Sequence, residues 1–223
     1  MDYPVNEMFQ TIQGEGVYTG VPSVFIRMQG CPVGCSWCDT KYTWDKMPEW
    51  QRSLENIIVK TAPDNTWCSA DETALSQAPA GQSWTARHVV ITGGEPCIYD
   101  LRPLTEALEA AGFHCQIETS GTHLILCSDH TWVTLSAKVN MRGGYKVLPQ
   151  ALVRADELKH PVARERDIEA LDALLALLKD DKKRLIALQP VSQGASATAL
   201  CIETCIARNW RLSLQTHKYI NIP

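Results

Sequence analysis

The 223-residue chain lacks the hydrophobic segments that would hold it in a membrane or carry it across one. No apolar run approaches the roughly 18 residues that a transmembrane helix needs. The opening residues, MDYPVNEMFQ, include acidic side chains and lack the apolar core of a secretory signal peptide. We therefore expect a cytoplasmic protein with no membrane partner.

Positive charge is also scarce. The chain carries 21 lysines and arginines against 25 aspartates and glutamates, which gives a net charge of −4 at pH 7. Proteins that bind the phosphate backbone of nucleic acids usually present a basic surface. We thus predict no nucleic-acid partner, although one or two arginines remain sufficient to hold a small anionic ligand.

Internal repeats, low-complexity tracts and long linkers are missing as well. Apolar residues make up 45% of the chain, enough for the core of one large domain or two small ones. Because no linker divides the sequence, we predict a single domain over residues 1–223.

Segments typical of strands and helices alternate along the chain. Amphipathic helical patterns cover 101–112, 166–180 and 198–209, and strand-like segments lie around them. This alternation is typical of βαβ units and predicts an α/β fold with a parallel sheet. The predicted strands are 23–29, 87–92, 113–119, 132–136, 155–160, 184–189 and 210–215.

Polar or glycine-rich clusters follow most of these strands directly. The carboxyl ends of parallel strands meet at one end of a barrel or an open sheet. We therefore expect the clusters to converge on one site. They are the cysteine-rich loop after 23–29, TGGEP (92–96), ETSGT (118–122), SAK (136–138), QPVSQ (189–193) and QTHK (215–218).

Residues 41–84 do not follow the alternation. They hold four of the seven tryptophans and show no clean hydrophobic period. We predict a mostly helical insertion after the cysteine-rich loop.

Nine cysteines are many for such a chain, but a disulfide framework is not expected in a reducing compartment. Six are scattered, and we interpret most of them as small buried core residues. Cys201 and Cys205 share one face of a predicted helix, which favours core packing over ligation.

The other three cysteines, Cys31, Cys35 and Cys38, lie within GCPVGCSWCDT (30–40). Structural zinc needs four ligands, and the motif contains neither a second cysteine pair nor a histidine. A [4Fe-4S] cluster usually takes four thiolates, so three would leave one iron open for chemistry. A zinc site or a chance grouping is the alternative.

The C-x3-C-x2-C spacing resembles the signature of the radical S-adenosylmethionine (SAM) superfamily. The resemblance implies an incomplete βα barrel of about six mostly parallel strands, with SAM bound to the open iron of a [4Fe-4S] cluster. TGGEP is similar to the turn that meets the SAM amino group, where glycines allow close backbone approach. The residues implied around SAM are Trp37, Cys38, Asp39, Gly94, Glu95, Ser136, Ala137, Lys138 and Gln189.

Further segments, NEMFQTIQGEG, CDT, ETSGT, SAK and QTHK, are together similar to 7-carboxy-7-deazaguanine synthases over nearly the whole chain. That family makes 7-carboxy-7-deazaguanine and ammonia from 6-carboxy-5,6,7,8-tetrahydropterin by a ring contraction in queuosine biosynthesis. The resemblance implies SAM as a reusable cofactor, Mg²⁺, a homodimer and a flavodoxin-type electron donor. The rivals are a glycyl-radical-enzyme activase and a non-catalytic iron–sulfur or zinc module.

The resemblance also implies substrate contacts. Arg27 offers a planar fork for a carboxylate, and Glu118 offers acceptors for a 2-aminopyrimidine edge. The hydroxyl of Thr40 is a hard ligand suited to Mg²⁺. The competing interpretations are a surface salt bridge, a structural cap and a turn residue, respectively. The full substrate set is Ile12, Gln13, Gly14, Arg27, Thr92, Glu118 and Pro223, and no protein group is predicted to act as a nucleophile.

Overall fold

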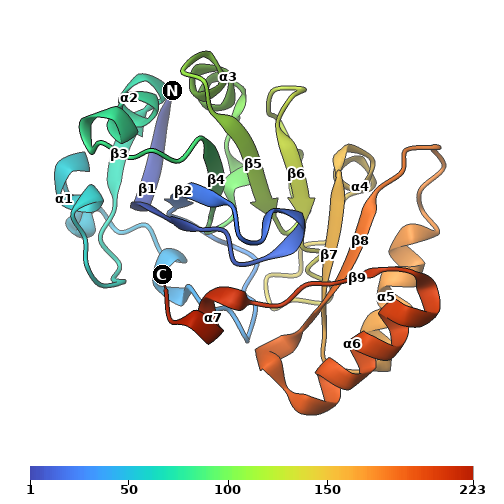
Figure 1. The fold of residues 1–223 in the computed structure, drawn as a ribbon. Helices are drawn as coiled ribbons and strands as arrows, with labels where there is room; N and C mark the ends of the chain where they lie inside the picture. The colour runs from blue at the N-terminus through green and yellow to red at the C-terminus, as the bar shows by residue number, and fades with distance from the viewer. Residues whose placement is uncertain (223) are drawn as a thin grey trace.

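A single open sheet is the frame of the structure, a computed structural model whose described residues are 1–222 (Figure 1). The strand order is β3-β1-β2-β4-β5-β6-β7-β8-β9. From β2 to β9 every neighbouring pair is parallel, whereas β1 is antiparallel to both β2 and β3. The strands are β1 (Asp2–Ile12), β2 (Pro22–Met28), β3 (Cys68–Asp71), β4 (His88–Gly93), β5 (His114–Thr119), β6 (Trp132–Leu135), β7 (Glu157–Val162), β8 (Leu185–Pro190) and β9 (Arg211–Leu212).

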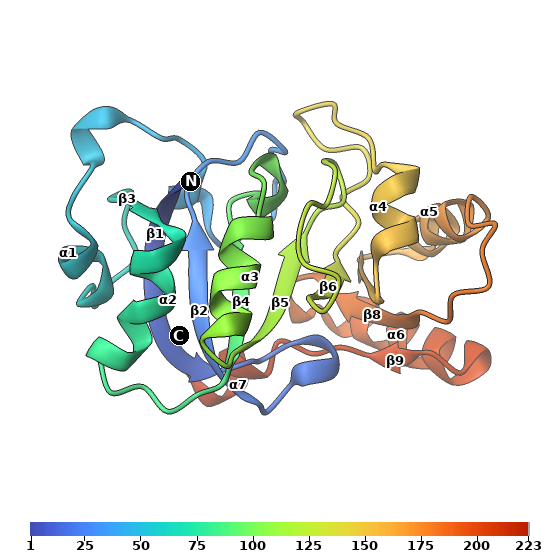
Figure 2. The same cartoon turned by 90° about the horizontal axis from the view of Figure 1, so that it is seen from above.

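Helices cover one face of this sheet, as α2, α3 and α4 show in both views (Figures 1 and 2). Helix α3 illustrates the local signals: a proline lies in its first turn, and Gly112, just beyond its end, has a φ of 86°. The helices are α1 (Leu54–Ile58), α2 (Glu72–Gly81), α3 (Arg102–Ala110), α4 (Pro149–Arg154), α5 (Glu165–Leu175), α6 (Ala195–Arg208) and α7 (Thr216–Ile220). Short 3₁₀ helices are η1 (Gly16–Tyr18), η2 (Lys41–Thr43), η3 (Pro48–Trp50), η4 (Pro96–Ile98) and η5 (Val191–Gln193).

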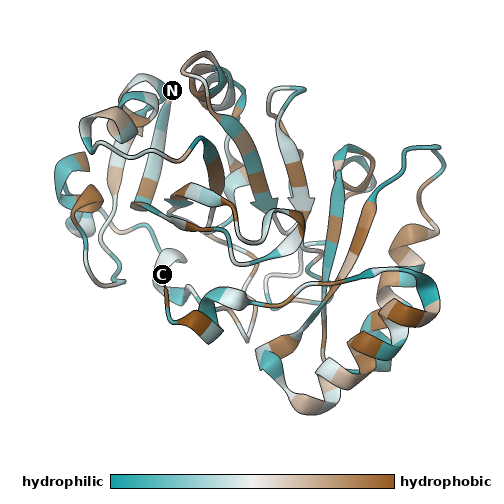
Figure 3. Ribbon diagram, viewed as in Figure 1, coloured by the Kyte–Doolittle hydropathy of each residue, from teal (hydrophilic) through white to brown (hydrophobic). Residues whose placement is uncertain are grey.

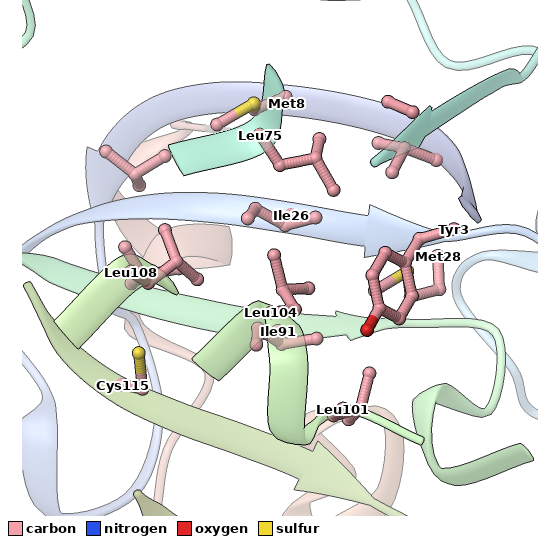
Figure 4. Close-up of a cluster of buried hydrophobic side chains, with 14 of the residues drawn as sticks. Tyr3, Met8, Ile26, Met28, Leu75, Ile91, Leu101, Leu104, Leu108 and Cys115 are labelled. Atoms are coloured by element: carbon pink, nitrogen blue, oxygen red, sulfur yellow. The ribbon is translucent and has the colours of Figure 1, made fainter. Parts of the chain in front are cut away.

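The hydrophobic core lies between the helices and the sheet. Figure 4 shows its largest cluster, in which Ile26 of β2 and Ile91 of β4 pack with Leu104 and Leu108 of α3. These four side chains are fully buried, and burying such a residue contributes about 1.5–3 kcal/mol. Ala111, which the helical period places on the same face, is exposed instead because α3 ends at Ala110.

The other face of the sheet is polar because side chains alternate along a strand. In β5, Cys115 and Ile117 join the core, while Gln116 and Glu118 point to the opposite side. Figure 3 shows this alternation as brown and teal bands along the strands. The face away from the helices is therefore lined by groups that can bind a polar ligand.

The predicted α/β fold, an incomplete βα barrel with a mostly parallel sheet that does not close, is confirmed. The sheet has nine strands where about six were expected, and the sequence prediction missed β1 and β3. The alternation of β1 is broken by a β-bulge between Val5 and Glu7, and β3 is only four residues long. As a result, residues 41–84 contain η2, η3, α1 and all of α2, and also a strand that joins the sheet.

The scattered cysteines are mostly core residues, as predicted. Cys68, Cys97 and Cys115 are buried, and Cys201 and Cys205 pack with Leu188. Within residues 1–222, no helix combines the length and the apolar character needed to cross a lipid bilayer.

Candidate active site

One pocket opens at the carboxyl ends of the parallel strands, where the polar and glycine-rich clusters meet. Its volume is about 320 Å³. All predicted site residues line it except Ala137 and Pro223, and Pro223 lies outside the described residues. The predicted residues that line the pocket are Ile12, Gln13, Gly14, Arg27, Cys31, Cys35, Trp37, Cys38, Asp39, Thr40, Thr92, Gly94, Glu95, Glu118, Ser136, Lys138 and Gln189.

The cysteine loop is held at its base by backbone hydrogen bonds to η2 and the residue after it. The amides of Gly30 and Cys31 donate to the carbonyls of Thr43 (2.7 Å) and Trp44 (3.1 Å). Further along, the carbonyl of Val33 accepts from the amide of a glycine in the 140–144 loop at 3.0 Å. These contacts keep the loop beside the pocket, so its three thiols face the same space.

The donor set fits a cluster better than a single ion. In the described part of the chain, no three His, Cys, Asp or Glu side chains are close enough to hold one metal ion. A [4Fe-4S] cluster has no such requirement, because each thiolate binds a different iron. Burial raises the pKa of Cys31 to about 11 and also raises that of Cys35, so iron binding must displace protons from both thiols.

The TGGEP turn at the end of β4 lies directly against the cysteine loop. The amides of Gly94 and Glu95 donate to the carbonyls of Met28 and Gly30, both at 2.9 Å. A Cβ on Gly94 would lie 2.1 Å from the Gly30 oxygen, and one on Gly93 would lie 2.4 Å from the Met28 nitrogen. Only glycine permits this approach to the loop, and the expected approach of these glycines to SAM stays a prediction.

The side chain of Glu95 has a structural role. It is buried, and its oxygens accept from Thr119 Oγ1 (2.6 Å), the Cys97 amide (3.0 Å), and the Ser120 amide (2.8 Å) and hydroxyl. These four donors fill the acceptor sites of the carboxylate and join the ends of β4 and β5. Because the Glu95 amide also donates to Gly30 and its carbonyl accepts from the Ile98 amide, a ligand could meet Glu95 only through the second lone pair of that carbonyl.

Comparisons with known proteins show what the whole chain is similar to. No protein-family model matches the chain. The 7-carboxy-7-deazaguanine synthase of Escherichia coli (strain K12) is 66% identical over 222 residues, which cover 100% of both chains. The enzyme of that name from Buchnera aphidicola is 51% identical over the same length and coverage. The crystal structure of QueE from Escherichia coli aligns with a TM-score of 0.94 and 65% identity, over 96% of this chain and 94% of that one.

The chain belongs to the 7-carboxy-7-deazaguanine synthase family. Members of this family are radical SAM enzymes that act on a small molecule, so a [4Fe-4S] cluster and SAM are expected in the pocket. The three cysteines and the adjoining glycine turn line the same pocket.

Arg27 has both an ion pair and free donors in this 7-carboxy-7-deazaguanine synthase fold. Its Nε donates to Glu7 Oε2 at 2.7 Å, and its guanidinium carbon lies 5.8 Å from the centre of the Phe9 ring. Its side chain is only 17% exposed, so this is not the surface salt bridge considered from the sequence. Among residues 1–222 its two terminal nitrogens have no hydrogen-bond partner, and they remain available in the pocket.

Thr40 closes the cysteine loop and begins the turn into η2. Its carbonyl accepts from the hydroxyl (2.8 Å) and the amide (2.9 Å) of Thr43. Its own hydroxyl lies 3.6 Å from Cys38 Sγ and lines the pocket. The turn uses the backbone of Thr40, so its hydroxyl, which is hydrogen-bonded to Cys38 Sγ, is compatible with a place in the pocket.

The SAK segment after β6 is tied to the end of β5. The amides of Ser136 and Lys138 donate to the carbonyls of Thr119 (2.7 Å) and Ser120 (3.3 Å). Ala137, predicted near SAM, does not line the pocket, because alternation turns its side chain into the core between the sheet and α4. Only its backbone lies next to the pocket residues.

Lys159 and Glu15 received no role from the sequence, yet both line the pocket. The ammonium of Lys159 lies 2.6 Å from Glu15 Oε2 and 2.7 Å from Glu118 Oε2. A signal did exist in ELKHPV (157–162), where Glu157 and Lys159 alternate with the buried Leu158. Charged residues at alternate positions of a buried strand indicate a polar interior.

The C-terminal segment closes one side of the pocket. The Thr216 amide donates to the Gly14 carbonyl at 2.9 Å, and Lys218 pairs with Asp39 at 2.8 Å. A Cβ on Gly14 would lie 2.4 Å from Nδ1 of His217, so only glycine leaves room for this packing. The last helix thus joins the loop after β1 to the cysteine loop.

Proposed function

We propose that the protein is a radical SAM enzyme that converts 6-carboxy-5,6,7,8-tetrahydropterin into 7-carboxy-7-deazaguanine and ammonia, on the route to queuosine. The observation that carries the proposal is the pocket that joins the three-cysteine loop to Arg27 and Glu118. A guanidinium and a carboxylate suit a substrate that has a carboxylate at one end and N–H donors at the other. The full-length identity to 7-carboxy-7-deazaguanine synthases supports the same reaction.

Cys31, Cys35 and Cys38 each supply one thiolate, which leaves one iron for SAM. The bound cluster and SAM supply the hydrogen-atom abstraction that starts the reaction, so no protein nucleophile is assigned. The residues of this chain orient SAM and exclude water. We assign this role to Trp37, Cys38, Asp39, Gly94, Glu95, Ser136, Ala137, Lys138 and Gln189, with Glu95 and Ala137 acting through their backbones.

The substrate lies between Arg27 and Glu118. The terminal nitrogens of Arg27 bind its carboxylate, while Nε keeps the ion pair with Glu7. Glu118 accepts from the 2-aminopyrimidine edge. The remaining contacts are assigned to Ile12, Gln13, Gly14, Thr92 and the terminal residue Pro223.

Mg²⁺ binds at Thr40. The support for this assignment is an oxygen donor at the rim of the cysteine loop, in a pocket where the metal can also reach a substrate carboxylate. A magnesium ion held by Thr40 would help to orient the substrate carboxylate, and this role would not require an ionised water.

We further propose that residues 1–223 act as one radical SAM domain in a cytoplasmic homodimer, with a flavodoxin-type protein as electron donor. All nine cysteines are free thiols, which suits a reducing compartment. The continuous sheet from β3 to β9 supports a single domain.

Anaerobic reconstitution tests the function. We expect iron and sulfide to restore cluster absorption, and SAM, dithionite, Mg²⁺ and carboxytetrahydropterin to yield the deazapurine, detected by mass spectrometry. Cys35→Ala should abolish both signals, whereas Cys201→Ala, at a core cysteine, should keep them. A loaded cluster that cleaves SAM without forming a deazapurine would overturn the assignment.

A further inference from the structure

A buried lysine between two carboxylates lies inside the pocket, and the reaction scheme above does not use it. The side chain of Lys159 is 3% exposed, and its ammonium contacts Glu15 Oε2 at 2.6 Å and Glu118 Oε2 at 2.7 Å. Glu15 lies in the loop after β1, Glu118 lies next to the end of β5, and Lys159 lies in β7. The lysine therefore joins three separate elements at the site where the substrate is proposed to bind.

The acceptor capacity of Glu118 is only partly used. A carboxylate offers about four lone-pair positions. Gln116 donates to Oε1 at 3.2 Å and Lys159 to Oε2 at 2.7 Å, while Gln13 lies at 3.5 Å, the limit of a hydrogen bond. One acceptor position remains on Oε2, and the second position on Oε1 is taken only by the long contact from Gln13. A ligand with two parallel N–H donors would occupy the first position and displace Gln13 from the other.

This acceptor role depends on the charge of Glu118. A protonated carboxyl is itself a donor and cannot accept two N–H groups side by side. Burial raises the pKa of Glu118, Lys159 lowers it, and the Glu15 carboxylate raises it again, with a result of about 7. Burial and the Glu15 carboxylate both favour the protonated form of Glu118, and the Lys159 ammonium opposes them by favouring the ionised form.

Other titratable groups face the same site. Glu157, two positions before Lys159 in β7 and on the same face, accepts from Thr134 and from the Val17 amide. Lys138, after β6, and His217, in α7, also lie within electrostatic range of Glu15. Within the described residues, Lys159 is the cation that contacts Glu118 directly.

We propose that Lys159 is a positioning residue that keeps Glu118 ionised and correctly oriented for the N–H donor edge of the substrate, with Glu15 as the counter-charge that anchors it. This inference rests on the proposed function. It extends that function by assigning selectivity for a 2-aminopyrimidine edge to an ion-paired trio rather than to Glu118 alone.

Charge-balanced variants test the proposal in the reconstituted holoenzyme. In Lys159→Met, Glu118 faces the Glu15 carboxylate without a cation, so KM should rise roughly tenfold to hundredfold at pH 7. The acid limb of the kcat/KM profile should move to higher pH by about one unit. In Lys159→Met/Glu15→Gln the like charge is removed as well, so KM and the acid limb should return part of the way toward wild type.

Lys182→Met is the matched control. Lys182 pairs with Asp156 at 2.7 Å near the amino ends of β7 and β8, away from the pocket, and its loss should leave KM and the profile unchanged. Cluster absorption and the near-ultraviolet circular dichroism of each variant report folding. If Lys159→Met does not fold, Glu15→Gln alone carries the test, because it should move the acid limb to lower pH.

Three outcomes distinguish a positioning role of Lys159 from a purely structural role and from failure of the proposed function. A double variant that is worse than Lys159→Met, with an unmoved acid limb, would make the lysine a structural residue only and overturn the proposal. A wild-type KM in Lys159→Met would do the same. Failure of the proposed function would differ from both, because the wild-type enzyme would then make no deazapurine under any condition.

Discussion

At the scale of single residues, Arg27 can serve the fold and a ligand together. Its Nε is occupied by Glu7, and the ring of Phe9 supports the guanidinium from one side. A guanidinium has five N–H donors in a rigid fork, so an ion pair through Nε still leaves the terminal nitrogens for a carboxylate. A lysine has a single ammonium and cannot divide its donors in this way.

Arg27→Lys should therefore raise the KM for the pterin about tenfold, while cluster absorption and SAM binding stay at wild-type levels. Steady-state kinetics together with a visible spectrum check both parts. Arg102→Lys, at an exposed arginine paired with Asp100, is the control and should change neither. An unchanged KM in Arg27→Lys would remove Arg27 from the substrate site.

The hydroxyl of Thr40 gives a second prediction at this scale. Thr40→Val keeps the shape of the side chain but loses the oxygen, so stimulation of turnover by Mg²⁺ should disappear. Thr40→Ser keeps the oxygen and should retain the response. A magnesium titration of product formation measures both variants. Equal stimulation in the two variants would exclude Thr40 as a metal ligand.

At the scale of elements, backbone hydrogen bonds join the end of β4 to the cysteine loop. Gly94 has no space for a side chain, since an added Cβ would lie 2.1 Å from the Gly30 oxygen. Relief of this overlap would require β4 and the loop to separate, which would also break the hydrogen bonds from Gly94 and Glu95.

Gly94→Ala should lower the free energy of unfolding by about 1–3 kcal/mol and impair cluster assembly. Urea denaturation and iron content after reconstitution measure these effects. Gly81→Ala, at the end of α2, is the matched control, because no atom lies within 4 Å of its added Cβ. That variant should be as stable as the wild type or slightly more stable. A stable, iron-loaded Gly94→Ala protein would show that the close approach is dispensable.

At the scale of the whole molecule, acid stability depends on buried histidines. Burial lowers the pKa of His160 to about 4, and its Nδ1 has no partner among the described residues. In the unfolded chain the group titrates near its usual value of about 6.5. As the pH falls below that value, the unfolded state binds a proton at His160 that the folded state does not bind. The free energy of unfolding therefore decreases between pH 6.5 and pH 4.

Between pH 7 and pH 5 this linkage should cost the metal-free protein about 2 kcal/mol of unfolding free energy. His160→Gln should lose that part of the pH dependence, whereas His130→Gln, at an exposed histidine, should keep it. Urea denaturation at both pH values checks the difference. The raised pKa of Glu118 makes the folded state more stable as the pH falls, which is the opposite effect. This contribution is the same in the wild type and in both histidine variants, so it cancels when their pH slopes are compared. A wild-type pH slope in His160→Gln would contradict the assignment.

The sequence by itself determined the parts of the molecule that depend on local spacing. Cys31, Cys35 and Cys38 and the glycines of TGGEP could be interpreted because cluster ligation and close backbone approach each need particular residues a few positions apart. The α/β class also followed from local patterns, since amphipathic helices and buried strands repeat with different periods. Strand β1 was not predicted because its β-bulge breaks the alternation of side chains along the strand.

Only the tertiary structure decided which distant charges meet. Glu15 and Lys159 are 144 positions apart, and Lys159 and Glu118 are 41 apart, yet one ammonium contacts both carboxylates. No local pattern encodes that contact, because it depends on the order of strands in the sheet and on which side chains alternate inward. Spacing along the chain can specify a ligand set held by one loop, whereas a site assembled from several strands is specified by how those strands pack.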